Sequence, residues 1–448
     1  MQLTADRRQL RINAVVAGTI LLLACLIGLL QLRTGGAIVL AFLPWLLLGV
    51  AEPRGLAALS LALLPYSNSL LPGQAQLTAA DALLVIAAAA VVVRSISQGA
   101  TSGVAHGLRP LAPVLLIYGT SMLVSLAAHP SAASAQEVLQ RTQLVVVPLL
   151  VGSAARELEW TRRSLHAFTI GMAFFSALDY LGYHVSRDVL DLIFPLINQQ
   201  KNPTAQFIAT GILIVLSGLT SRRVTLTAFP LLVLGLGIAG SRGALVGLAA
   251  GIVALIAMTN GRQRIRTTIG LALLTAFMAV TVLRFLPSFQ RDRLLDFSGR
   301  NAQLRGTLTQ SQYALALRTS YSRDAKQIIK THPLTGVGLG QYAAGIGPTF
   351  TRNPHNVFLA EAAEGGLGHA AAFSLLAGGS IFVVVRRRRY APRLAALAVA
   401  VQTSVLVHSL TDIYWVRGTP EIGWFLVGLT LGRSSAAAEA PEVLATAP

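Results

Sequence analysis

A single histidine at the end of a long polar stretch has the surroundings of a catalytic base. His355 lies in Asn353-Pro-His-Asn356, directly before an apolar run. Asn353 is a favourable helix N-cap and Pro354 suits the first helical position, so we expect His355 in the first turn of a helix. The positive end of the helix dipole disfavours an imidazolium there, and a neutral ring can accept a proton as a general base. The alternative is a capping or interfacial histidine without chemistry.

Two basic elements lie at the ends of other apolar runs. Arg242 stands in Gly240-Ser-Arg-Gly243, between two short apolar runs. A charge inside a bilayer is costly and usually marks function, and the small neighbours would let a large ligand approach the guanidinium. Lys201 and Asn202 open an Asn-Pro helix start at the outer end of another run. They are either a simple helix cap or ligand-binding residues in the same compartment.

Further ionisable residues stand inside apolar runs, where each needs a partner. Glu361 and Glu364 follow His355 in one run, and they could orient a neighbouring polar group or line a wet cavity. Two pairs have i,i+4 spacing and so share a helix face: Glu137 with Arg141, and His408 with Asp412. We expect no metal and no cofactor, because no cluster of carboxylates, histidines or cysteines has ligand spacing.

Composition defines the class of chain that must position these residues. Of 448 residues, 54% are hydrophobic and 12% are charged, and the mean hydropathy is +0.63. A soluble domain carries roughly 25% charged residues, so a water-soluble enzyme is excluded, and the apolar content excludes a disordered chain. The single Cys25 excludes a disulfide framework and a cysteine-based zinc site. We therefore predict an all-α, polytopic integral membrane protein.

The formal net charge of +18 reflects membrane topology and not a nucleic-acid interface. Of 36 basic residues only 3 are lysines, and most arginines lie in short loops between apolar runs. With a cytoplasmic N-terminus, the basic residues gather in the inner loops, which places both termini in the cytoplasm. The apolar runs fall at 14–32, 36–51, 55–71, 78–93, 110–128, 137–155, 164–184, 203–220, 224–240, 243–258, 267–286, 356–385, 394–412 and 418–432. Some are shorter than the ~20 residues of a span, so we predict about 12, at most 14, transmembrane helices, a few of them re-entrant or broken.

This pattern divides the chain into four parts. Residues 1–286 form N-terminal transmembrane helices, 287–355 a large outer-face loop, 356–433 C-terminal transmembrane helices and 434–448 a disordered cytoplasmic tail. Long loops escape the positive-inside rule, so the basic charge of the outer loop is not a topology signal. Ser311 to Thr331 predicts a helix whose apolar face, including Ala325, Ile328 and Ile329, could lie on the membrane. The following Gly336, Gly338 and Gly340 predict a tight turn with exposed backbone N–H groups.

The stretch from Arg318 to Gly368 resembles the O-antigen ligase and polymerase superfamily of bacterial membrane glycosyltransferases. The matching residues are Arg318, His332-Pro-Leu-Thr-Gly-Val-Gly-Leu-Gly340, His355-Asn356, Leu359 and Glu364-Gly-Gly-Leu-Gly368, together with Gly240-Ser-Arg-Gly243 upstream. The polytopic layout with one large outer loop agrees with this family. The resemblance covers about 50 residues directly.

The resemblance implies a GT-C type transferase in the bacterial inner membrane with a periplasmic active site. Its donor would be O-antigen on undecaprenyl pyrophosphate, its acceptor the sugar of lipid A-core, and membrane lipids its surroundings. His355 matches the catalytic histidine of the family, and Arg242 and Arg318 match its basic residues for the donor diphosphate. Lys201, Asn202, Asn356 and Glu364 are the further candidates for substrate binding. The family is thought to work without a metal.

Three other functions remain in view. An O-antigen polymerase shares the donor but extends another lipid-linked glycan; the loop arginines lack a glycine eleven positions on, a spacing often found in polymerases, and this favours a ligase. A protein O-oligosaccharyltransferase is a further relative. A transporter or flippase is disfavoured, because no inverted repeat or regular pairing of broken helices is found.

We predict that residues 287–355 are extracytoplasmic, from the arginine asymmetry of the short loops. A cysteine introduced near Gln310 should react with an impermeant thiol reagent in intact cells with a permeabilised outer membrane. Labelling that occurs only after lysis of the inner membrane would contradict this orientation.

Overall fold

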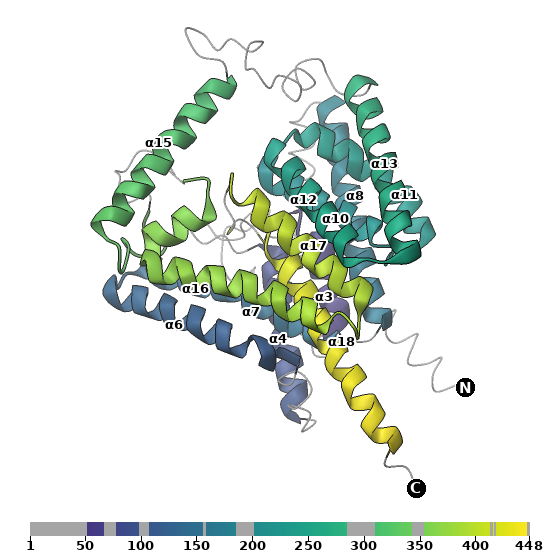
Figure 1. The fold of residues 1–448 in the computed structure, drawn as a ribbon, viewed down its shortest axis with the longest axis horizontal. Coiled ribbons are helices and arrows are strands. Elements are labelled where there is room, and N and C mark those ends of the chain that lie inside the picture. The colour runs from purple at the N-terminus through teal and green to yellow at the C-terminus, as the bar shows by residue number, and fades with distance from the viewer. Residues whose placement is uncertain are drawn as a thin grey trace, which may run out of the picture.

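The described part of the chain is built from helices alone. The computed structural model describes residues 52–66, 78–97, 107–155, 158–184, 201–284, 310–342, 354–412, 415 and 418–445, and no strand occurs among them. The helices in chain order are α3 (Pro53–Leu63), α4 (Ala79–Ser97), the 3-10 turn η1 (Arg109–Leu111), α6 (Ala112–Ala128), α7 (Ala132–Ala154), α8 (Leu158–His184), α10 (Lys201–Leu216), α11 (Arg222–Ala239), α12 (Arg242–Met258), α13 (Gly261–Arg284), α15 (Gln310–Thr331), α16 (Val357–Arg387), α17 (Pro392–His408) and α18 (Glu421–Ala445). Figure 1 shows their arrangement.

The helices have the length and surface of a membrane protein. Within the described ranges three segments are long and apolar enough to span a bilayer, namely Arg109–Ala128, Arg222–Ala239 and Val357–Arg387, and five shorter helices are also apolar. Large apolar side chains stay exposed, among them Leu116 at 69%, Leu226 at 63% and Val253 at 66%. The predicted all-α membrane class is therefore confirmed. The count of 12 to 14 spans, the GT-C type and the outer-face loop stay predictions, and the runs 14–32 and 36–51 lie outside the described residues.

Small residues allow close packing of α12 on α17. Gly243, Gly247 and Gly251 recur at four-residue steps on α12 and therefore face one side. A Cβ added at Gly247 would lie 2.7 Å from the Ser404 carbonyl oxygen, and one at Gly251 would lie 2.9 Å from that of Ala400. Only glycine permits this approach, which is a common way for helices to associate in membranes.

The helix α16 is broken in its middle. Gly366 has φ 83° and ψ 173°, a conformation that interrupts the helical hydrogen bonds and is essentially restricted to glycine. A Cβ at this position would lie 2.1 Å from the carbonyl oxygen of Leu334. This break lies in the long apolar run 356–385, whereas broken helices were predicted among the runs shorter than a membrane span, so that prediction stays a prediction.

The predicted helix Ser311–Thr331 corresponds to α15, which spans Gln310–Thr331. Its apolar residues Ala325, Ile328 and Ile329 pack with Tyr342 and with residues of α16. The face that was expected to meet the membrane therefore meets α16, because the break in that helix brings the loop back onto it. In Figure 1, α15 projects from one end of α16 and α6.

The predicted division into four parts stays a prediction, and two of its parts can be compared with the described residues. The helix α18 continues through Ala445, so most of the segment 434–448 that composition marks as a disordered tail is helical. About half of the predicted outer-face loop, residues 287–309 and 343–353, lies outside the described residues.

Candidate active site

The backbone places His355 before the helix and not in its first turn. The N-cap of α16 is Asn356, whose Oδ1 accepts a hydrogen bond from the Leu359 N–H at 3.1 Å. Asn356 Nδ2 also donates to the Leu410 carbonyl oxygen at 3.2 Å. The prediction that Asn353 caps this helix is therefore wrong. The N-cap lies three residues later, because Asn356 forms hydrogen bonds both to the first turn of α16 and to the turn that contains Leu410. The dipole argument for a neutral His355 no longer applies.

His355 has an unusual backbone conformation. Its φ is +49°, and it is the one non-glycine residue with positive φ in the described part of the chain. Such strained positions cluster at functional sites, where surrounding contacts hold them. Here the Val357 N–H donates to the Ser409 carbonyl oxygen at 2.9 Å, which ties the start of α16 to the turn after α17. His355 is thereby held against that turn.

A carboxylate holds the imidazole of His355. His355 Nδ1 lies 3.1 Å from Asp412 Oδ1, and the histidine side chain is 29% exposed while that of Asp412 is 10% exposed. The ring of Tyr321 in α15 stacks on the imidazole, with centroids 6.3 Å apart and planes at 26°. A carboxylate on Nδ1 fixes the orientation of the ring, as in other sites with a histidine base. Asp412 was expected only as a partner of His408, so its role at His355 was missed.

The carboxylate of Asp412 also links His355 to the helix that begins with Arg242. His408 Nε2 lies 3.9 Å from Asp412 Oδ2, as the i,i+4 spacing predicts. His408 Nδ1 lies 2.9 Å from Gln206 Oε1 in α10. A Cβ at Gly243 would lie 2.7 Å from His408 Cδ2, so the glycine after Arg242 packs directly on this histidine.

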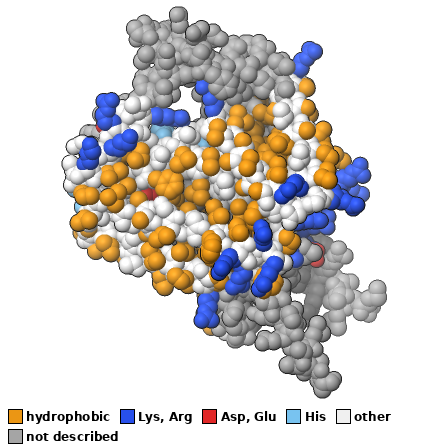
Figure 2. All heavy atoms as spheres, in the orientation of Figure 1, with side chains coloured by type: hydrophobic (Ala, Val, Ile, Leu, Met, Phe, Trp, Pro, Cys, Tyr) orange, Lys and Arg blue, Asp and Glu red, His pale blue; other side chains and the backbone are white. Residues whose placement is uncertain are grey.

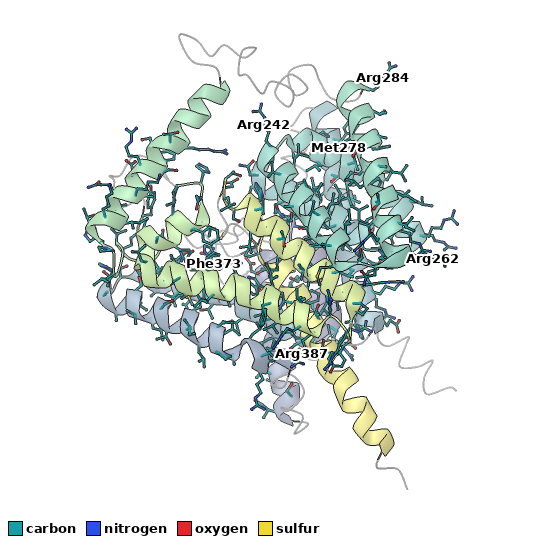
Figure 3. All side chains as sticks on the ribbon, in the orientation of Figure 1. Arg242, Arg262, Met278, Arg284, Phe373 and Arg387 are labelled. Carbon is teal, nitrogen blue, oxygen red and sulfur yellow. The ribbon has the colours of Figure 1, made fainter. Side chains whose placement is uncertain are left out.

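The two predicted arginines belong to elements that border this cluster. Arg242 is the first residue of α12 and is partly exposed; Figure 3 shows its side chain projecting from that end of the helix. Arg318 in α15 is also partly exposed and lies near enough to His408 to act on it electrostatically. Arg242 thus begins the helix that packs on His408, and Arg318 acts electrostatically on the same histidine.

The other candidate residues for substrate binding do not all lie near His355. Asn202 Oδ1 accepts a hydrogen bond from Ser241 Oγ at 2.8 Å, which joins the start of α10 to the start of α12, where Ser241 is the N-cap. Lys201 is the first residue of α10, and its side chain lies outside what the structure describes. Glu364 is 9% exposed and belongs to a second, buried cluster.

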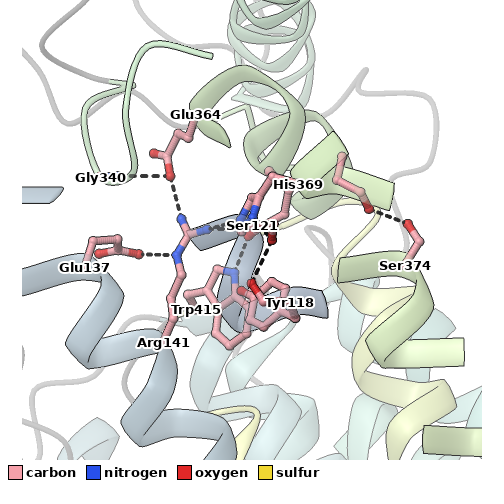
Figure 4. A network of polar contacts seen from close by, with 11 residues as sticks. Tyr118, Ser121, Glu137, Arg141, Gly340, Glu364, His369, Ser374 and Trp415 are labelled. Atoms are coloured by element: carbon pink, nitrogen blue, oxygen red, sulfur yellow. Dashed lines mark hydrogen bonds and ion pairs between the residues drawn. The ribbon is translucent and has the colours of Figure 1, made fainter. Parts of the chain in front are cut away.

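That second cluster centres on Arg141, whose side chain is 3% exposed (Figure 4). Its Nε donates to Glu137 at 2.8 Å, as the i,i+4 spacing predicts, and one terminal nitrogen donates to Glu361 at 2.8 Å. The other donates to Glu364 at 2.5 Å. Three carboxylates thus surround one guanidinium, and each of its nitrogens has an acceptor.

The cluster around Arg141 ties three segments of the site together. Glu364 also accepts a hydrogen bond from the Gly340 N–H at 3.1 Å, which fixes the glycine-rich loop. Glu361 accepts one from Trp415 Nε1, three residues after Asp412. His369 Nε2 lies 2.7 Å from Glu361. The expectation that Glu361 and Glu364 orient neighbouring polar groups is confirmed, whereas substrate contact by Glu364 stays a prediction.

The glycine-rich loop completes the break in α16. The N–H groups of Val337 and Gly338 donate to the carbonyl oxygens of Ala363 and Glu364, at 3.0 and 2.9 Å. The tight turn is therefore confirmed, but these N–H groups are not exposed as predicted. They pair with carbonyls that the break at Gly366 leaves without helical partners.

The comparisons with known proteins support one family. Fold and site together define an all-helical membrane protein with a His–Asp pair bordered by arginines. A family model described as O-antigen ligase matches residues 227–374. The match covers about a third of the chain; it confirms the resemblance seen in the sequence and supports a transferase role at a coarse level. The matched range includes Arg242, Arg318, His355, Asn356 and Glu364. The comparison with curated proteins finds no match for this chain.

We predict that Arg141→Gln destabilises the protein strongly. Removing one partner of a buried ion pair leaves uncompensated charge and costs about 3–5 kcal/mol. Thermal unfolding in detergent measures the loss. The control is Arg163→Gln, because the exposed pair of Arg163 with Glu159 should contribute about 1 kcal/mol or less. Equal losses in the two variants would contradict a central role for Arg141.

Proposed function

We propose that the protein is an O-antigen ligase, which transfers O-antigen polysaccharide from undecaprenyl pyrophosphate to a sugar of lipid A-core. The observation that carries this proposal is the pairing of His355 Nδ1 with Asp412 at 3.1 Å, within the cluster that Arg242 and Arg318 border. The O-antigen ligase match over residues 227–374 supports the same reaction.

His355 is the proposed general base. A proton on Nδ1, donated to Asp412, places the basic lone pair on Nε2. The acceptor hydroxyl attacks the anomeric carbon of the donor sugar and gives its proton to Nε2. The bond between that carbon and the diphosphate oxygen breaks, and undecaprenyl pyrophosphate leaves. A single displacement of this kind inverts the anomeric centre. Asp412 stabilises the imidazolium that forms.

Arg242 and Arg318 are the proposed partners of the diphosphate. Negative charge develops on the leaving group, and a guanidinium can bind two of its oxygens at once. These cations would act in place of a metal ion, so we propose a metal-independent reaction. Within the described ranges no group of three His, Cys, Asp or Glu residues is placed to hold a metal.

The other candidates receive more limited roles in this proposal. Lys201 and Asn202 open α10, and the Asn202–Ser241 bond holds their helix beside Arg242. Asn356 holds the turn that carries Asp412 and could contact substrate from the N-cap. Glu364 fixes the glycine-rich loop, and we propose that it contacts substrate at that loop. We place the site on the periplasmic face of the bacterial inner membrane, with both termini in the cytoplasm.

We predict that His355→Gln and His355→Ala lose roughly 10²- to 10⁴-fold in turnover, the usual contribution of a general base. Gln can form a hydrogen bond but cannot take the proton. Transfer from lipid-linked O-antigen to lipid A-core is measured with purified protein, and Asp412→Asn should also slow it. The control is His332→Gln, because His332 is an exposed histidine of the same loop. Near wild-type turnover of His355→Gln would reject the base role.

We predict that Arg242→Lys and Arg318→Lys also impair transfer, because lysine keeps the charge but loses the bidentate geometry. The Michaelis constant for the lipid-linked donor should rise in both variants. Arg284→Lys, an exposed arginine at the end of α13, serves as the control. Full activity in both site variants would remove the diphosphate assignment.

A further inference from the structure

One face of α15 carries three cations that the proposed reaction does not use. Arg323, Lys326 and Lys330 follow each other at steps of three and four residues, which places them on one side of the helix. All three are exposed. We call these three residues the basic stripe. Figure 2 shows Lys and Arg side chains gathered at the left of the molecule, where α15 lies in Figure 1.

Neither topology nor pairing with the residues that the structure describes accounts for the basic stripe. The loop that contains it is long, and charges in long loops do not set membrane orientation. None of its three cations forms an ion pair with another residue that the structure describes. Three like charges on one helix face repel each other, and within the described residues no ion pair of these three cations offsets this repulsion.

Packing fixes the direction in which the basic stripe points. Ala325, Ile328 and Ile329 bury the opposite side of α15 against α16 and Tyr342. The same helix places Tyr321 on the imidazole of His355. Lys330 is nine residues beyond Tyr321, which corresponds to roughly 14 Å along a helix. Along the helix axis the basic stripe therefore extends roughly 14 Å beyond the tyrosine that stacks on His355, on the exposed side of α15.

We propose that the basic stripe binds phosphate groups on the acceptor oligosaccharide and holds the acceptor while its hydroxyl reaches His355. This inference rests on the proposed transferase function. The acceptor fits better than the donor, because Arg318, which we assign to the donor diphosphate, is one helical turn from Tyr321 beside His355, whereas the basic stripe continues away from that turn to Lys330. Exposed cations attract an anionic ligand over a distance and lose this effect in salt.

The test compares acceptors that differ only in charge. The wild type and the triple variant Arg323→Gln, Lys326→Gln, Lys330→Gln receive purified lipid A-core before and after phosphatase treatment. The triple variant should raise the Michaelis constant for the phosphorylated acceptor roughly tenfold, with kcat and the donor constant unchanged. With the dephosphorylated acceptor, the two proteins should be alike. Added salt should reduce the difference.

The control removes the same number of charges elsewhere. In the variant Arg223→Gln, Arg262→Gln, Arg266→Gln, three exposed arginines of α11 and α13 are replaced, and the acceptor constant should not change. Thermal unfolding of both variants checks that they fold.

Four results would overturn the inference. The Michaelis constant for the phosphorylated acceptor could be unchanged in the stripe variant, or it could rise equally with the dephosphorylated acceptor or in the control variant. The stripe variant could also lose binding to anionic vesicles without any change in transfer kinetics. Absence of transfer by the wild type with either acceptor is a different result, since it rejects the proposed function itself.

Discussion

The break in α16 at Gly366 is the constraint on which the rest of the site depends. A helix interrupted inside a membrane protein must have its freed carbonyl groups paired, because an unsatisfied group there costs several kcal/mol. The glycine-rich loop provides this pairing through the N–H groups of Val337 and Gly338, and the Pro333 carbonyl accepts from the Leu367 N–H at 2.9 Å. The loop and the helix therefore require each other, and α15, which leads into the loop, is fixed on α16 as a consequence.

Buried charge extends this arrangement to the proposed base. Arg141 satisfies Glu361 and Glu364 on the half of α16 that precedes the break. Glu364 in turn holds the loop at Gly340, and Glu361 holds Trp415 close in sequence to Asp412. A guanidinium taken out of water is tolerated only when its partners remain in place. The cluster thus couples the position of the loop to the position of the turn that orients His355.

Local signals in the sequence predicted local structure well. Hydropathy gave the all-α membrane class, the absence of Gly and Pro gave α15 nearly to the residue, and i,i+4 spacing gave the pair of Glu137 and Arg141. Contacts across the chain left no such signal: Asp412 is 57 residues from His355, and Glu361 is 220 residues from Arg141. The start of α16 was misplaced because Asn353-Pro and Asn356 are both good caps, and only the contact of Asn356 with Leu410 decides between them. The break in α16 could have been predicted from Gly365 and Gly366, because two adjacent glycines inside an apolar run indicate an interruption of a helix.

Two neighbouring glycines allow the most direct test of this account. Gly366 has the left-handed φ, and a Cβ there would meet the loop, whereas a Cβ at Gly368 would have no atom within 4 Å. Purified Gly366→Ala and Gly368→Ala are compared for thermal unfolding and for transfer from lipid-linked O-antigen to lipid A-core. The account predicts that Gly366→Ala loses about 3 kcal/mol or more of stability and most of its transfer, while Gly368→Ala behaves as the wild type. A Gly366→Ala protein as stable and active as Gly368→Ala would contradict it.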